Sequence, residues 1–131
     1  MRLLHSLGIV AIVLCLLQLE PAPARAAGVS IRGYFTSAFT DAAYQQKMVS
    51  KVIARWNPKT ALPAAGKKTV FIIKLNREGQ LAYKKLHLSS GADSFDKAAE
   101  KCIDTAGPFA PLPASFRYQY LEVHFHFEIV K

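Results

Sequence analysis

The chain has little cysteine, little acidic charge and few of the motifs that mark enzymes. Among its 131 residues are two cysteines and one tryptophan, and nine acidic residues stand against 17 lysines and arginines, giving a formal net charge of +8. It contains no internal repeat, no glycine-rich phosphate loop and no GxSxG nucleophile motif. These absences exclude repeat architectures, P-loop nucleotide hydrolases and α/β-hydrolases from the interpretation.

The first residues have the pattern of a secretory signal. A basic residue precedes an apolar run, and Ala-Arg-Ala at 24–26 puts small residues where a signal peptidase reads them. We expect residues 1–26 to be a signal peptide cleaved before Ala27, which leaves a periplasmic or secreted protein with a net charge of +7. The alternative is an uncleaved inner-membrane anchor, because residues 3–19 reach the lower length limit for crossing a bilayer.

Cleavage would leave a single cysteine. Cys15 lies in the expected signal, so Cys102 has no partner for an internal disulfide. We interpret Cys102 as a small buried hydrophobe; a reactive or dimer-forming thiol is the alternative.

A β-hairpin is predicted in the middle of the chain. Residues 69–76 are rich in β-branched and aromatic types, and residues 80–88 have a similar but less marked composition. Between them, Arg77-Glu78-Gly79 supplies the glycine of a short turn. Two antiparallel strands are therefore expected.

Two amphipathic helices flank this hairpin. The first is expected over residues 41–56, capped by Thr40 or Asp41, after a short linker at 27–40. The second is expected over residues 95–105, capped by Asp93 or Ser94 and ended by Gly107-Pro108, with Asp96 among its solvent-facing residues.

The last strand is predicted over residues 118–130 from strict alternation. One face carries Leu121, Val123, Phe125, Phe127 and Ile129, and the other carries Tyr118, Tyr120, Glu122, His124, His126 and Glu128. The sequence thus predicts an α+β two-layer sandwich of topology α-β-β-α-β, with both helices on the apolar face. We expect a three-stranded antiparallel sheet of order 2-1-3, with the last strand at an edge.

The order of these elements resembles the TonB/TolA C-terminal domain. The resemblance covers about residues 44–129 and rests on these motifs in sequence: W-N-P at 56–58, V-F-I-I-K-L at 70–75, R-E-G, S-S-G, F-D-K-A-A, P-F-A-P-L-P and a final F-H-F. It implies that residues 41–131 form a periplasmic module that binds other envelope proteins through a sheet edge. It also implies a protein that is not an enzyme and needs no cofactor.

The expected binding site is the edge formed by the last strand, since an unpaired strand can add an extended peptide. Its outer-face residues, Tyr118, Tyr120, Glu122, His124 and His126, would select the partner. By resemblance the partner is an outer-membrane transporter segment or a Tol-type protein; a homodimer through the same edge is the alternative. No nucleic-acid motif is present, and membrane contact is expected only if the signal stays uncleaved.

Two further functions are alternatives to this binding module. An inner-membrane-anchored energy transducer of the TonB or Tol system would need a long spacer, whereas residues 27–40 are short. A metal site could use His124 and His126, but we expect none because His87, the third candidate ligand, is predicted to lie elsewhere.

Overall fold

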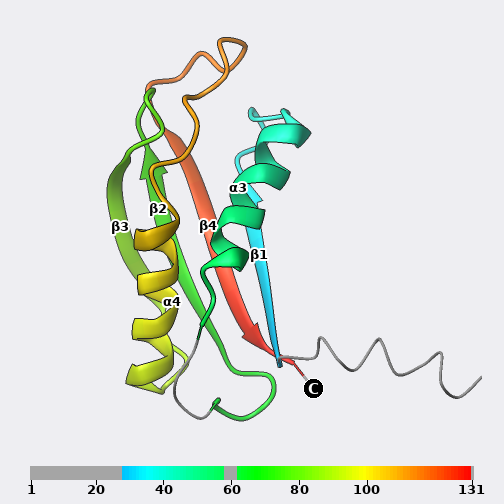
Figure 1. Cartoon of the computed structure of the whole chain (residues 1–131), viewed down its shortest axis with the longest axis vertical. Helices are drawn as coiled ribbons and strands as arrows, with labels where there is room; N and C mark the ends of the chain where they lie inside the picture. The colour runs from blue at the N-terminus through cyan, green and yellow to red at the C-terminus, as the bar shows by residue number, and fades with distance from the viewer. Residues whose placement is uncertain (1–27, 58–61, 131) are drawn as a thin grey trace, which may run out of the picture.

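Four strands and two helices make up the described part of the chain. The structure is a computed structural model that describes residues 28–57 and 62–130 (Figure 1). Its elements, in order, are β1 (Val29–Phe35), α3 (Ala42–Ala54), β2 (Lys68–Leu75), β3 (Leu81–Leu88), α4 (Asp93–Ala106) and β4 (Leu121–Ile129). Both helices lie against one face of a single sheet, with α3 along β1 and α4 along β2 (Figure 1). The predicted α+β class is confirmed.

The sheet has four strands rather than the three predicted. Its order is β1-β4-β2-β3, and every neighbouring pair is antiparallel. The β2–β3 hairpin and the pairing of the last strand with β2 agree with the prediction. The additional strand is Val29–Phe35, in the segment expected to be a linker, and it pairs along β4 from Ile129 to Val123. The last strand therefore lies inside the sheet, and its expected position at an edge is wrong.

Strand β1 can lie beneath α3 because it contains a glycine. The helix-facing residues of β1 include Ile31, Gly33 and Phe35, which pair with buried residues of β4. A Cβ on Gly33 would come within 3.0 Å of the Val49 side chain on α3. The missing side chain thus lets the helix approach the sheet closely.

The helix boundaries follow partly from local chemistry. The Asp41 carboxylate accepts from the Tyr44 amide over 2.9 Å, so its predicted role as the cap of α3 is confirmed. Helix α4 begins at Asp93, after an Ala92 cap that has no side-chain bond, so the predicted capping by Asp93 or Ser94 is wrong. It ends before Gly107, as expected.

The core lies between the sheet and the two helices. The five apolar residues of β4 that were predicted to share one face are all buried: Leu121, Val123, Phe125, Phe127 and Ile129. They pack with Met48 and Val52 of α3 and with Phe95 and Ile103 of α4. Burial of such large side chains is the main stabilisation expected of a domain this size.

The β2–β3 turn is fixed to the segment that leads into β4. The Arg77 carbonyl accepts from the Leu112 amide over 2.9 Å, and the Gly79 carbonyl accepts from the Phe109 amide over 3.0 Å. The Arg77 guanidinium also donates to three carbonyl oxygens of this segment, those of Pro113, Phe116 and Tyr118. These bonds hold the turn end of β3 in place.

Candidate binding edges of the sheet

The predicted site residues do not lie on a free edge. Strand β4 pairs with β1 on one side and β2 on the other, so it cannot add a peptide strand while both pairings are intact. Glu122, His124 and His126 project from the sheet face opposite the helices, since their neighbours on β4 face the core. Tyr118 and Tyr120 precede β4 and are exposed. Glu122, His124 and His126 share one face of the sheet, but the five predicted residues do not form the edge that was expected.

Three histidines gather on this outer face. The rings of His87 and His124 have centroids 6.5 Å apart, so His87 is nearer than the sequence suggested. His124 Nε2 lies 2.7 Å from an oxygen of Glu122, and His126 packs edge-on against Tyr34. Within residues 28–57 and 62–130, no three His, Cys, Asp or Glu side chains are grouped so that they could hold a metal.

The environment of His126 disfavours its charged form. Burial lowers the pKa of the His126 imidazole, and the positive charges of Lys68 and His124 lower it further, against an opposing effect of Glu128. The neutral form of the His126 imidazole is therefore favoured relative to a histidine in water.

The edges of the sheet are β1 and β3. Strand β3 is exposed along nearly its whole length and carries four large hydrophobic side chains in solvent, Leu81, Tyr83, Leu86 and Leu88. The bond from the Asn76 amide to the Gln80 carbonyl starts the β2–β3 ladder, and ladder bonds alternate along antiparallel strands. Lys84 and Leu86 accordingly direct their backbone N–H and C=O groups away from β2.

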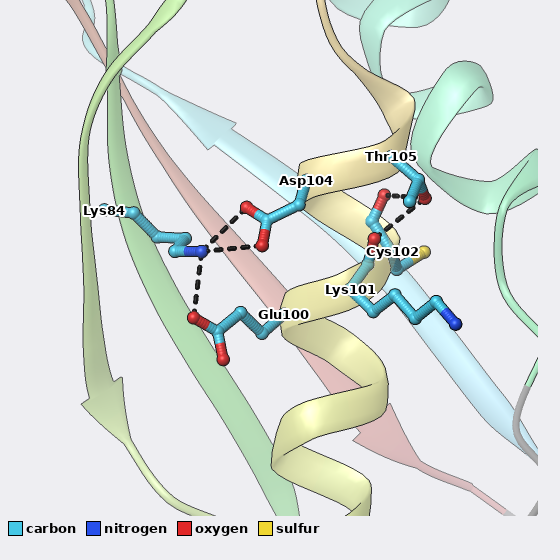
Figure 2. A network of polar contacts seen from close by, with 6 residues as sticks. All are labelled: Lys84, Glu100, Lys101, Cys102, Asp104 and Thr105. Atoms are coloured by element: carbon cyan, nitrogen blue, oxygen red, sulfur yellow. Dashed lines mark hydrogen bonds and ion pairs between the residues drawn. The ribbon is translucent and has the colours of Figure 1, made fainter.

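A hollow of about 180 Å³ lies beside this edge, between β3 and α4. Its lining includes Lys84, Leu86, Lys97 and Glu100. The Lys84 ammonium spans the gap and contacts Glu100 at 2.8 Å and Asp104 at 2.7 Å (Figure 2). Burial lowers the pKa of Lys84, but hydrogen bonds to the two carboxylates outweigh it and the pKa is raised. Lys84 is therefore held charged against α4.

The far end of β3 is tied to α4 through Asp96, which was expected to face solvent and is instead buried. Its carboxylate accepts from the hydroxyls of Thr69, Ser89 and Ser90 and from the Ser90 amide. Burial raises the pKa of this carboxyl, but the hydrogen bonds from Ser89, Thr69 and Ser90 together outweigh it, so the pKa is lowered. The Ser89-Ser90-Gly91 segment is thus hydrogen-bonded to α4, and these bonds fix where β3 ends.

A family profile described as TonB C terminal matches residues 41–127. The chain belongs to the TonB C-terminal family. Searches of curated proteins and of solved structures find no match. Domains of the TonB C-terminal family are typically protein-binding modules of the cell envelope.

The family match and the structure differ in extent. Strand β1 precedes residue 41, so the TonB C-terminal match does not include it. In the described part of the chain, no helix is both long and apolar enough to span a bilayer. The expected signal peptide at 1–26 lies outside the described residues.

Proposed function

We propose that this protein is a periplasmic binding module that recruits an envelope protein by β-strand addition at β3. The observation that supports this most is the exposure of β3, a whole edge strand with outward backbone groups at Lys84 and Leu86. This replaces the β4 edge expected from sequence. No catalytic step is proposed.

The surroundings of β3 can select side chains of the incoming strand. Successive side chains of an added strand point to opposite faces of the sheet. On the helix side they would meet the hollow between β3 and α4. On the outer side they would meet a second hollow, lined by Lys74, Ala82, Tyr83 and Tyr120. Backbone bonds would supply affinity, and these two hollows would supply specificity.

The charge of the domain favours an acidic partner segment. Lys85 lies on the edge strand itself, whereas the charge of Lys84 is offset by Glu100 and Asp104, and the chain that cleavage before Ala27 would leave carries +7. Charge of opposite sign on a partner would raise the rate of association. An outer-membrane transporter segment or a Tol-type protein that bears carboxylates is the partner we propose.

A pull-down from envelope extract tests the edge. Leu86→Pro removes an N–H that points away from β2, so the variant should stay folded by circular dichroism yet capture at least about tenfold less partner. Leu86→Glu keeps the backbone and adds a negative charge that repels an acidic segment, and it should also weaken capture. His124→Ala, on the outer face of β4, should bind like wild type. Undiminished capture by both Leu86 variants would reject the β3 site.

The anchored transducer is the second candidate, supported by the family match together with the apolar residues 3–19. N-terminal sequencing and membrane partition of the protein expressed in a Gram-negative host separate the two. A start at Ala27 in the soluble fraction supports the free module. An intact Met1 in the membrane pellet supports the transducer.

A further inference from the structure

A small hollow lies on the helix side of the domain, where the chain that leaves α4 passes beside α3 on its way to β4 (Figure 1). It has a volume of about 180 Å³ and a largely apolar wall. The residues that line it are Tyr44, Lys47, Met48, Lys51, Phe109 and Ala110. None of them belongs to β3 or to the outer face of the sheet, so this hollow is separate from the β3 edge.

Hydrogen bonds hold the two sides of the hollow together. The Tyr44 hydroxyl donates to the Ala110 carbonyl over 2.6 Å, and the Lys51 ammonium donates to the Pro108 carbonyl over 2.7 Å. The Tyr44 ring also packs edge-on against Phe39, with ring centroids 5.3 Å apart. Burial raises the pKa of Tyr44 to about 12, so its hydroxyl remains a donor at neutral pH. The hollow is therefore preformed, and a ligand does not have to order its walls.

A row of positive charge runs along α3 beside the hollow. Lys47, Lys51 and Arg55 follow one another at intervals of four residues, which places them on one side of a helix. The first two also line the hollow. Helix α3 contains no acidic residue, and within residues 28–57 and 62–130 none of these three side chains forms an ion pair. The row thus presents uncompensated charge next to an apolar hollow.

From these observations we propose that this surface is a second binding site, which takes an acidic segment of a protein partner through one aromatic side chain. A cavity of about 150 Å³ holds a benzene ring, so the hollow of about 180 Å³ has room for one phenylalanine ring. The rings of Tyr44 and Phe109 would contact it. Carboxylates next to that phenylalanine would meet Lys47 and Lys51, and Lys51 retains N–H donors beyond its bond to Pro108.

A protein segment fits this surface better than an anionic membrane does. Helices that bind a membrane surface bury apolar side chains that project from them. Here the apolar residues beside the lysines are recessed, since Met48 and Phe109 are both buried. Protein interfaces instead concentrate their binding energy in aromatic side chains that enter such hollows. The proposal does not depend on what binds at β3.

Fluorescence polarisation with two labelled peptides tests the proposal on the full protein, as its host produces it. The first peptide, EDEFEDE, carries one phenylalanine between carboxylates, and the second, EDEAEDE, has the same charge but alanine in its place. We expect the phenylalanine peptide to bind at least about tenfold more tightly. Ala110→Leu, which fills the hollow with a larger side chain and leaves the charge unchanged, should abolish that difference.

Two lysine variants separate the row on α3 from the general charge of the domain. Lys47→Glu should weaken binding of the phenylalanine peptide at least about tenfold, because it reverses a charge that lines the hollow. Lys67→Glu makes the same change in the exposed loop before β2 and should weaken binding no more than about twofold. Circular dichroism checks that each variant is folded.

Equal affinity of the two peptides for the wild type overturns the proposal, and so does a preference that survives Ala110→Leu. A Lys47→Glu protein that binds no more weakly than Lys67→Glu also overturns it. Leu86→Pro, which blocks β3, should leave the affinity unchanged; a loss there would place the peptide at the β3 edge and reject this site. Binding to phosphatidylglycerol vesicles without binding to either peptide would assign the surface to a membrane instead.

Discussion

The Phe109 amide donates to the Gly79 carbonyl over 3.0 Å, and this bond joins the β2–β3 turn to the segment preceding β4. The contact requires glycine for two reasons. Gly79 has a φ of +86°, and a Cβ there would lie 2.2 Å from the Phe109 carbonyl oxygen. Because that neighbour is backbone, it cannot move aside as a flexible side chain could.

Gly79→Ala should therefore destabilise the domain by more than about 3 kcal/mol, from backbone strain and displacement of the 107–120 segment together. Urea unfolding followed by circular dichroism measures the loss. Gly91→Ala is the matched control: Gly91 has a similar φ of +91° but nothing near its Cβ position, so the cost there should be about 1–2 kcal/mol. Equal losses at the two sites would contradict the importance of the Phe109 contact.

The hydrogen bonds to the buried Asp96 carboxylate predict a defined dependence of stability on pH. Its folded-state pKa lies below the ordinary value of 3.8, so its contribution is complete above that value and disappears as the pH falls through the lower folded pKa. Asp96→Asn should cost about 2–3 kcal/mol near neutral pH, since hydroxyls and an amide lose a charged acceptor.

The difference in unfolding free energy between wild type and Asp96→Asn should shrink as the pH is lowered towards about 2. Asp93→Asn is the control, because Asp93 is highly exposed and its ion pair with Lys97 lies at the surface. It should change stability by at most about 0.5 kcal/mol. A pH-independent difference at Asp96 would show that its charge is not what matters.

Lys84 should couple β3 to α4 through charge. Lys84→Met removes contacts to Glu100 and Asp104 and should cost about 0.5–1 kcal/mol, with the loss reduced in 1 M salt. Lys97→Met removes a more exposed pair one turn apart on α4 and should cost less. Unfolding in urea at low and high salt compares the two; a cost at Lys84 that salt does not change would point to packing of its aliphatic chain.

Cys102 should be inert in the folded protein. Burial raises the pKa of its thiol to about 12, and its sulfur donates to the Val52 carbonyl over 2.8 Å. A thiol reagent such as DTNB at about pH 8 should react only after the protein is unfolded, because the thiolate is the nucleophile. Rapid labelling of the native protein would instead support the reactive-thiol interpretation.

Much of the fold could be predicted because its signals are local. The alternation of Leu121 to Ile129 fixed which face of β4 is buried, and Arg77-Glu78-Gly79 located the hairpin. Strand β1 was missed because its core-facing positions include Gly33, which breaks the apolar alternation, and its partner is distant in sequence. Without β1, the sequence predicts β4 at an edge, and the predicted binding residues therefore belong to a strand that lies inside the sheet. Asp96 is buried where it accepts a hydrogen bond from Thr69 of β2, and the helical pattern around Asp96 carries no signal of that contact.

Strand β1 also has a consequence for the order in which the sheet can assemble. Val29 pairs with Ile129, 100 residues later, and among the described strands β1 pairs with β4 alone. A ribosome makes β1 before any other described element and β4 after all of them, so the first strand must wait unpaired while the hairpin and both helices are synthesised. Closing so long a loop is slow relative to local folding. Completion of the sheet is therefore expected to be the late step of folding, after the hairpin has formed.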